Sequence, residues 1–471
     1  MERNKTIMFF IFVFAIFLCI TAPALFSEGM FMDGLIYAAI SKNMAGGEGS
    51  FWYPHLSETF FPEFHEHPPL ALAMQSVLFR IFGNSIYIER FYSLLTYLIA
   101  GFIIIGIWKE VTGERKTAWI PLFLWILVPN ISWACANNML ENTMTVFVCF
   151  SVLFYLKSLK NRRLLFLILS GFAITAGVLS KGFTALFPWS LPLWFWLFTK
   201  RTRFSRMAFD TLLIILFSTL PVVLLFINSP ETADSLTKYF NKQVLGSIQN
   251  VQTVDSRFSI VWGFLSQIIL PVIIGIFVLI AGRIKKVDPN LFKKNVSLML
   301  AFFLLSFCGV FPIMISMKQR LFYVLSTYPF FAIGLGVLIL PVSRQLLSRI
   351  KQNSTGMKIF TVFSCILLVT GIVLSITQIN NIGRDKDKIH DVKLITEKIP
   401  SDSIISICPG MWQDWSLHGY FARYGAINLD AGSTPEYDYY LTDGNCDNDV
   451  LKTYYKRVEV EARKYNLYKR K

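Results

Sequence analysis

The feature that most constrains the fold is a series of long apolar runs along most of the chain. A membrane-crossing helix needs about 20 mostly apolar residues, with a usual range of roughly 17–25. Runs of this kind occur eleven times, at 7–26, 88–108, 117–134, 142–158, 164–180, 183–199, 207–227, 258–281, 296–316, 322–341 and 358–378. A shorter apolar stretch, 69–83, is interrupted by Gln75 and Arg80. We predict a helix there that lies at the interface or re-enters the membrane.

The composition also indicates a membrane protein. Of the 471 residues, 54% are apolar and 16% are charged, whereas soluble domains usually have about 25% charged residues. The mean hydropathy is +0.51. A soluble, disordered or fibrous chain is therefore excluded. Arg3 and Lys5 precede the first apolar run, as in a signal peptide, but the run exceeds the roughly 7–15 residues of a signal h-region. We predict an uncleaved anchor.

The distribution of basic residues predicts the orientation. With the N-terminus in the cytoplasm, the cytoplasmic loops hold 22 Lys and Arg residues and the opposite loops hold 9, as the positive-inside rule requires. The fold class that we predict is an α-helical polytopic membrane protein with about 11 transmembrane helices. Its transmembrane domain is 1–378, with juxtamembrane helices in an outer loop at 27–87. Residues 379–471 then form a small extracytoplasmic α/β domain.

Within this last domain we predict a helix at 387–398, short strands at 403–407 and 437–441, and a strand or hairpin at 454–468. The domain either covers a site or receives an acceptor, or it only adds stability. Cys408 and Cys446 lie here and are predicted to pair in an oxidising compartment; the alternative is two free buried thiols. The other five cysteines lie in or beside apolar runs, where they are expected to pack.

The net charge of +15 does not indicate nucleic-acid binding. Before residue 382 there are 31 basic and 16 acidic residues, and after it there are 14 of each. The excess therefore lies in short loops between apolar runs, where it sets topology and contacts lipid headgroups, and not on one soluble face.

Distinctive ionisable residues gather on the predicted outer side: Asp33, His65-Glu66-His67, Glu141, Lys181, Lys318 and Arg320. Such groups at membrane depth are costly and often mark a substrate path or a catalytic site. Each also has a structural interpretation. Asp33 and Glu141 could cap helices, and His67 could end a loop. Lys181 could extend to the interface, while Lys318 and Arg320 could contact headgroups. All of them falling on one side favours a site.

The order of motifs resembles the polyprenyl-phosphate-sugar-dependent glycosyltransferases. These are GT-C membrane enzymes that include protein O-mannosyltransferases and the aminoarabinose transferases that act on lipid A. The resemblance covers roughly residues 7–341. It is carried by Asp33-Gly34 with Tyr37, Phe64-His65-Glu66-His67-Pro68-Pro69-Leu70, Glu89-Arg90 with Ser93, Ser180-Lys181-Gly182 with Pro188, and Lys318, Arg320, Tyr323 and Tyr328-Pro329.

The resemblance implies roles for individual residues. Asp33 resembles the essential acid of the family and is our candidate catalytic base. The candidates for binding the donor phosphate are His67, Arg90, Lys181, Lys318 and Arg320. The supporting candidates are Tyr37, Glu66, Glu141 and Tyr323. Two positions depart from the family: Glu141 stands where many members have Asp, and His67 stands where the lipid A branch has Lys. The latter favours a protein-mannosyltransferase-like or other sugar specificity.

The expected reaction moves a sugar from a polyprenyl-phosphate donor to a protein, lipid A or another glycan or lipid, on the periplasmic face of the inner membrane. Arg and Lys would stabilise the phosphate leaving group. Asp33 would accept the acceptor's proton, so direct attack predicts inversion. If the acceptor were itself a phosphate, Asp33 would only orient it.

Membrane lipid and the donor are the expected partners, and nucleic acid is not. No cofactor is expected to be required. His65, Glu66 and His67, with His55, are candidate ligands of a divalent metal, although adjacent residues bounded by prolines do not converge easily on one ion.

Two other functions remain open. A transporter or flippase of polyprenyl-linked glycans also fits many spans and intramembrane charge, but it often has paired repeats with broken helices, which are not visible between 1–235 and 236–471. A structural or assembly protein would need neither Asp33 nor the group of cations. Consumption of the lipid-linked sugar separates the enzyme from the flippase, which would move it unchanged.

Overall fold

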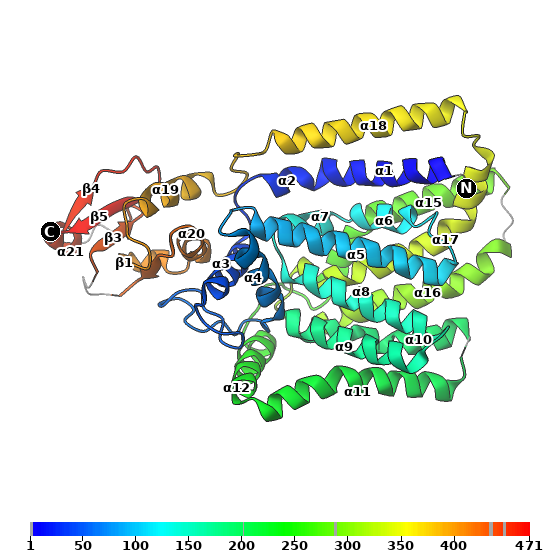
Figure 1. Cartoon of the computed structure of the whole chain (residues 1–471), viewed down its shortest axis with the longest axis horizontal. Helices are drawn as coiled ribbons and strands as arrows, with labels where there is room; N and C mark the ends of the chain where they lie inside the picture. The colour runs from blue at the N-terminus through cyan, green and yellow to red at the C-terminus, as the bar shows by residue number, and fades with distance from the viewer. Residues whose placement is uncertain (1–2, 201, 287–289, 433–436, 446–448) are drawn as a thin grey trace. The chain divides into compact units, whose positions relative to one another are not determined.

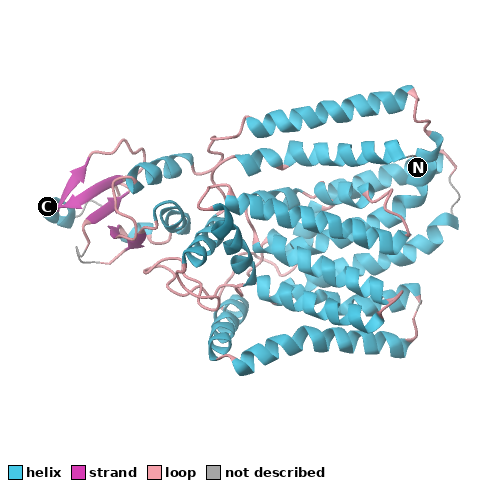
Figure 2. Cartoon of the chain, in the orientation of Figure 1, coloured by secondary structure: helices cyan, strands magenta, loops and turns pink. Residues whose placement is uncertain are grey.

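The computed structural model describes residues 3–200, 202–286, 290–432, 437–445 and 449–471, which are mostly helical (Figures 1 and 2). The chain divides into two compact units. Unit 1 comprises Met1–Leu25, Glu66–Ala71 and Ser93–Thr377, and unit 2 comprises Phe26–His65, Leu72–Tyr92 and Gln378–Lys471. Unit 2 therefore combines the residues predicted as a C-terminal domain with most of the predicted outer loop.

Unit 1 is a bundle of helices. Its elements, some ending at the boundary of the unit, are α1 (Arg3–Ile20), α2 (Ala22–Phe26), α5 (Ile88–Thr112), α6 (Trp119–Ile126), α7 (Pro129–Ala136), α8 (Leu140–Ser158), α9 (Arg163–Lys181), η1 (Phe183–Ser190), α10 (Leu191–Thr199), α11 (Phe204–Asn228), α12 (Pro230–Tyr239), η2 (Phe240–Leu245), α13 (Gly246–Gln249), α14 (Ser259–Gln267), α15 (Ile269–Ile284), α16 (Asn290–Val310), η3 (Phe311–Ile315), η4 (Leu321–Thr327), α17 (Tyr328–Arg349) and α18 (Thr355–Ile376). The η2 segment is a π-helix, and η1, η3 and η4 are 3₁₀-helices.

The predicted multi-pass architecture is confirmed. Among the described residues, eight helices are long and apolar enough to cross a membrane, and two bent pairs raise the number to ten. The pairs are α6 with α7, bent by 76°, and α14 with α15, bent by 51°. The remaining predicted span, 183–199, consists of η1 and the nine-residue α10. The total of eleven stays a prediction.

Side-chain contacts nevertheless show that η1 and α10 return across the bundle. Arg163 at the start of α9 binds Asp210 near the start of α11, with Nε 2.8 Å from Oδ1. Further along, Thr175 of α9 donates to the Ser218 carbonyl of α11 at 2.9 Å. The two helices therefore run parallel, so η1 and α10 between them run back from the Lys181 end of α9 toward the Arg163 end.

The first and last long helices of unit 1 are also parallel. Phe9 of α1 packs on Phe360 of α18 with ring centroids 4.9 Å apart, and further along Cys19 contacts the Leu367 carbonyl at 3.3 Å. Figure 1 shows α1 and α18 side by side. When an odd number of membrane-crossing segments alternates in direction, the first and the last segment run parallel. The arrangement thus agrees with the alternation predicted from the basic loops.

Unit 2 contains helices on a mixed sheet. Its elements are α3 (Met32–Gly46), most of α4 (Leu70–Phe82), the first turn of α5, α19 (Lys386–Thr396), β1 (Ile404–Ile407), η5 (Pro409–Met411), α20 (Trp415–Gly425), β2 (Asn428–Asp430), β3 (Tyr439–Thr442), α21 (Asp449–Tyr454), β4 (Tyr455–Val458) and β5 (Asn466–Arg470). The sheet has the order β2-β1-β3-β5-β4, with β1 parallel to both of its neighbours and the other pairs antiparallel (Figure 2).

The core of unit 2 joins distant parts of the chain. The register pairs Ile405 with Leu429 and Leu441 with Leu467, and all four side chains are buried. Leu35 of α3 belongs to the same apolar cluster. At the start of α5, Glu89 binds Arg423 of α20 at 3.1 Å, and both side chains are buried. The predicted short helix at 69–83, the helix at 387–398 and the strands of the tail are confirmed, whereas α20 and β2 were not predicted.

The tail cysteines are described in part. Cys408 is disulfide-bonded and buried, and the five cysteines in unit 1 are free thiols. Cys446 lies outside the described residues, so the predicted Cys408–Cys446 pair stays a prediction.

Candidate active site

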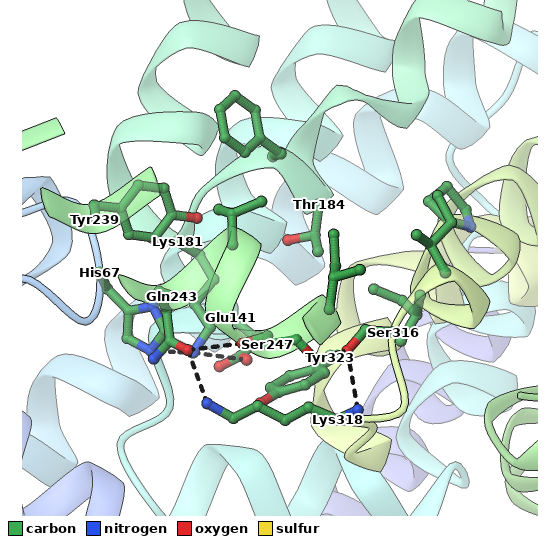
Figure 3. Close-up of a pocket in the computed structure, with 16 residues that line it drawn as sticks. His67, Glu141, Lys181, Thr184, Tyr239, Gln243, Ser247, Ser316, Lys318 and Tyr323 are labelled. Carbon is green, nitrogen blue, oxygen red and sulfur yellow. Dashed lines mark hydrogen bonds and ion pairs between the residues drawn. The ribbon is translucent and has the colours of Figure 1, made fainter. Parts of the chain in front are cut away.

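A cavity of about 300 Å³ lies in unit 1 at the Lys181 end of α9 (Figure 3). Five segments supply its walls: the loop before α4, the start of α8, the junction of α9 and η1, the α12–η2–α13 segment, and the stretch from η3 to η4. We call this the unit 1 cavity. A helix of 19 residues spans about 28 Å, so the cavity and the Arg163 end of α9 lie about one membrane thickness apart.

Lys181 is held at this cavity by a carboxylate and an imidazole. Its Nζ lies 3.1 Å from Oε1 of Glu141 and 3.0 Å from Nε2 of His67. Glu141 is fully buried in the first turn of α8, and Lys181 is the last residue of α9. The antiparallel packing of α8 and α9 brings the two together. Figure 3 shows all three side chains meeting at one side of the cavity.

Gly182 is required directly after Lys181. Its φ is +117°, a conformation that side chains rarely adopt. A Cβ at this position would also overlap the hydroxyl of Tyr239, which makes a backbone hydrogen bond with Phe183. The Lys-Gly pair of the sequence therefore ends α9 and lets α12 approach the lysine.

His67 is a neutral hydrogen-bond acceptor here. Burial, and then the charges of Lys181 and Lys318, hold the pKa of this imidazole well below its usual 6.5. Because Lys181 can only donate, Nε2 of His67 accepts and the ring proton is assigned to Nδ1. Pro68 and Pro69 fix the backbone that follows.

Gln243 connects a second group of charged residues. Its Nε2 donates to Oε2 of Glu66, and its Oε1 accepts from Nζ of Lys318 at 2.8 Å. Lys242 lies 3.8 Å from Oε1 of Glu66. Ser247, one turn later, donates to the same amide oxygen at 3.0 Å. The side chain of Gln243 thus links the α12–η2–α13 segment to the loops that carry Glu66 and Lys318.

The remaining walls are mainly apolar. They include Phe183, Val244, Ile248, Pro312, Ile313 and Ile315. A cavity with ammonium groups and otherwise apolar walls suits an amphiphile that carries an anionic group. In such a low-dielectric setting, charge-assisted hydrogen bonds are stronger than in water.

The structure brings together part of the predicted set. His67, Glu141, Lys181, Lys318 and Tyr323 line the unit 1 cavity, and Glu66 binds Gln243 beside it. Arg320 is exposed and is not among the lining residues. Its neighbour Gln319 is buried instead and donates to the Arg257 and Ser316 carbonyls.

Asp33, Tyr37 and Arg90 lie in unit 2. Asp33 is in the first turn of α3, whose N-cap is Phe31, so Asp33 is not the capping residue. Tyr37 is buried one turn further along. The guanidinium of Arg90 donates to the Gly29 carbonyl at 2.5 Å, and only 4% of the residue is exposed.

No metal cluster is visible in the described part of the chain. No three His, Cys, Asp or Glu side chains there are placed to hold a metal ion. His65 binds Glu63 at 3.1 Å, and His67 faces the ammonium of Lys181. The positive charge of the Lys181 ammonium beside Nε2 of His67 would repel a metal cation from that nitrogen.

Several lining residues were not predicted from the sequence: Thr184, Tyr239, Gln243, Ser247 and Ser316. The start of α12 carries a recognisable signal, because Ser229 caps the helix through the Thr232 amide and Pro230 follows it. The π-helix η2 has no comparable signal. Such segments are often found at functional sites.

The comparisons with known proteins agree with this fold. Residues 66–225 match the family described as dolichyl-phosphate-mannose-protein mannosyltransferase. No curated protein matches the sequence. The crystal structure of ArnT from Cupriavidus metallidurans bound to undecaprenyl phosphate matches with a TM-score of 0.68 and 14% identity, over 98% of this chain and 97% of that chain.

Two archaeal structures match over shorter parts of their chains. The apo oligosaccharyltransferase of Archaeoglobus fulgidus has a TM-score of 0.56 and 13% identity, over 89% of this chain and 64% of that chain. AglB from the same organism, in complex with an inhibitory peptide and a dolichol-phosphate, has a TM-score of 0.50 and 13% identity, over 93% and 70%. The resemblance to the GT-C membrane glycosyltransferases is therefore confirmed, and the fold is similar to that of ArnT.

Proposed function

We propose that the chain transfers a sugar from a polyprenyl-phosphate donor to an acceptor on the periplasmic face of the inner membrane. The observation that carries the proposal is the unit 1 cavity, in which Lys181 and Lys318 stand among apolar walls. An isoprenoid chain fits such walls, and its phosphate fits the ammonium groups. ArnT and AglB, whose folds are similar, are described in complex with undecaprenyl phosphate and dolichol-phosphate.

The proposed orientation follows from the basic loops. Arg163 and the basic residues before α11 lie at the opposite end of α9 from the unit 1 cavity. Since basic loops favour the cytoplasm, the cavity would face the periplasm, where lipid-linked sugars replace cytosolic nucleotide sugars as donors.

The proposed reaction is a single displacement. The acceptor's oxygen attacks the anomeric carbon, and the bond from that carbon to the phosphate oxygen breaks. The bonding electrons stay on the phosphate, whose growing charge Lys181 and Lys318 stabilise. The acceptor hydroxyl gives up its proton to a carboxylate base, for which the family resemblance makes Asp33 the candidate. The products are the inverted glycoside and polyprenyl phosphate.

The test measures donor binding and turnover separately on the purified protein in nanodiscs. Lys181→Met and Lys318→Met each remove one ammonium, and Lys351→Met is the matched control because Lys351 is exposed in unit 1 and does not line the cavity. A charge-assisted hydrogen bond is worth about 1.5–3 kcal/mol, so each cavity variant should weaken polyprenyl-phosphate binding by roughly 10- to 100-fold.

Equal affinities of all three variants for polyprenyl phosphate would contradict a phosphate site at Lys181 and Lys318. In proteoliposomes loaded with a polyprenyl-phosphate mannose and an acceptor mixture, release of polyprenyl phosphate supports transfer. Movement of the intact lipid-linked sugar across the bilayer without its consumption would identify a flippase instead.

A further inference from the structure

A second cavity of about 380 Å³ lies within unit 2 and is lined mainly by polar groups. We call it the unit 2 cavity. Ligand pockets usually have volumes of about 300–1,000 Å³. Its lining comes from the end of α3, the loop that follows it, the turn before β1, and the link from α20 to β2.

The Gly46-Gly47-Glu48-Gly49 motif, which has no role in the unit 1 cavity, supplies Glu48 and Gly49 to the lining of the unit 2 cavity. The α3 helix ends at Gly46, and Gly47 reverses the chain with a φ of +92°. Gly49 has a φ of +73°, and a Cβ there would lie 2.6 Å from the Tyr53 carbonyl oxygen and 2.9 Å from His55. These glycines let Glu48 and His55 face one space.

Two hydrogen-bond acceptors are left open toward this space. Asn43 is 5% exposed, and its Nδ2 donates to the His55 and Leu56 carbonyls at 3.2 and 2.9 Å. Its Oδ1 has no hydrogen-bond partner among the described residues and is not among the fully buried atoms. This oxygen is therefore accessible from the cavity that Asn43 lines. Nδ1 of His55 bonds the Pro62 carbonyl at 3.1 Å, which leaves Nε2 as an acceptor.

The charges around the unit 2 cavity are mainly negative. Among the described residues, Glu48, Glu58 and Asp402 line it and no Lys or Arg does. The nearby Lys42 directs its ammonium to the Ala422 and Arg423 carbonyls at 3.3 Å. The cavity thus offers acceptors in excess, and it would repel an anion.

We propose that the unit 2 cavity binds a saccharide unit that is neutral or carries an amine. Sugar hydroxyls and an ammonium are donors that match the Asn43 oxygen, the His55 nitrogen and the carboxylates. A phosphate, a uronate or an anionic headgroup does not match. No three potential metal ligands converge among the described residues, so a divalent ion does not account for the carboxylates. Saccharide binding at the unit 2 cavity does not depend on sugar transfer at the unit 1 cavity.

Saturation-transfer NMR tests the proposal on the full-length protein in nanodiscs free of glycoside detergents, with EDTA present. The probes are glucose, glucosamine and glucuronate, each at about 10 mM, since single sugars are expected to bind in the millimolar range. Glucosamine and glucose should give saturation transfer, and glucosamine should displace glucose. Glucuronate should give none. Equal signals for all three probes, or none for any, would overturn the proposal.

Variants locate the binding. Glu48→Gln with Asp402→Asn removes two cavity carboxylates, and asparagine tolerates the left-handed backbone at residue 402, where φ is +63°. The control Glu461→Gln removes an exposed carboxylate of unit 2 outside the cavity. The double variant should weaken glucosamine binding by about 10-fold or more, with an unchanged thermal unfolding midpoint, while the control binds normally. Equal binding by the double variant and the control would refute the site.

Discussion

At the scale of single residues, the group around Lys181 shows how a charged lysine is accommodated inside a bundle. Glu141 supplies an opposite charge and is itself fully buried, while neutral His67 accepts a hydrogen bond without adding charge. Removing one member of a buried ion pair typically costs about 3–5 kcal/mol. The arrangement keeps Lys181 charged at the cavity, where its ammonium can bind an anion.

The sequence predicted this group because Lys181, Glu141 and His67 stand out as ionisable residues between apolar runs. Gln243 and Tyr239 were missed because glutamine and tyrosine are ordinary in a polar loop, and only packing brings them to the cavity. Arg320 was predicted as a phosphate-binding residue from its place on the predicted outer side and from the family resemblance. In an irregular segment, however, neighbouring side chains point to different sides.

Asp33→Asn should reduce turnover by about 10²–10⁴-fold, the usual contribution of general-base catalysis. Asparagine keeps the size and hydrogen bonding of the side chain but cannot take a proton, so polyprenyl-phosphate affinity should be unchanged. Radiolabelled sugar transfer and donor binding would be measured on the same preparation. Asp387→Asn, on the surface of unit 2, is the control. Near-normal turnover of Asp33→Asn would show that another group, or none, acts as the base.

His418 should make unit 2 sensitive to mild acid. Burial lowers its pKa to about 4, despite the hydrogen bond to the Trp412 carbonyl. A histidine with a lowered pKa in the folded state stabilises the fold above about pH 6.5 and loses that contribution as the pH falls toward 4. At pH 5 the loss is about 2 kcal/mol, and the amides of α20 should exchange hydrogen roughly 30-fold faster after correction for intrinsic rates.

In a hydrogen-exchange experiment between pH 7 and 5, His418→Gln should reduce the change in the corrected exchange rate of the α20 amides with pH. Asp414 and Asp391 do not interfere in that window, because hydrogen bonds lower the pKa values of both carboxyls against the effect of burial. Their contribution is lost only at more acidic pH. An unchanged dependence in the variant would assign the acid sensitivity to a different group.

At the scale of elements, eight of the eleven apolar runs each form one long helix among the described residues, because an apolar run in a membrane can satisfy its backbone only as a helix. The runs 117–134 and 258–281 form bent pairs of helices instead. The segment 183–199 shows the limit of that argument. Pro188 and Pro192 lie within it, and a proline cannot donate to the preceding turn. The segment is a 3₁₀-helix followed by a short α-helix, and composition alone did not predict this.

Gly182→Ala should disturb the junction of α9 and η1. A Cβ would cost about 1–2 kcal/mol through the positive φ, and the overlap with the Tyr239 hydroxyl would add to this cost. We expect a lower thermal unfolding midpoint and weaker polyprenyl-phosphate binding. Gly113→Ala is the matched control, since Gly113 has a φ of +83° and nothing within 4 Å of the added carbon.

The double variant Gly182→Ala with Tyr239→Phe separates the two causes. Removing the hydroxyl should restore part of the lost stability, while the cost of the positive φ remains. If Gly182→Ala is no less stable than Gly113→Ala, then the approach of Tyr239 is not a constraint on the glycine.

At the scale of the whole molecule, alternating chain direction and asymmetric basic loops together predict which parts face the periplasm. The sequence also indicated a separate C-terminal domain, and its strands were largely predictable because isoleucine and tyrosine, which favour strands, predominate in 403–407 and 437–441. The association of this segment with residues 26–65 in unit 2 was not predicted. Contacts such as Lys393 with Glu28, 2.6 Å apart, join positions more than 360 residues apart, and no local pattern reveals them.

A reporter fused after Lys471 should show that the C-terminus faces the periplasm. Alkaline phosphatase, which is active only outside the cytoplasm, should be active in this fusion, and a cytoplasmic reporter should be silent. Fusions after Lys116 should show the reverse. A cytoplasmic C-terminus would overturn the orientation and the periplasmic site with it.

The π-helix η2 gives the unit 1 cavity different sensitivities to the loss and the gain of one residue. An α-helix advances by 100° per residue, and a π turn such as η2 holds one residue more than an α turn. Deleting Lys242 should let the π turn relax to an α turn, so that Ser247 and Ile248 keep their direction toward the cavity that they line. An alanine inserted after Lys242 should instead rotate Ser247 and Ile248 by about 100° away from the cavity. The insertion should therefore abolish polyprenyl-phosphate binding, whereas the deletion of Lys242 or its substitution by alanine should not.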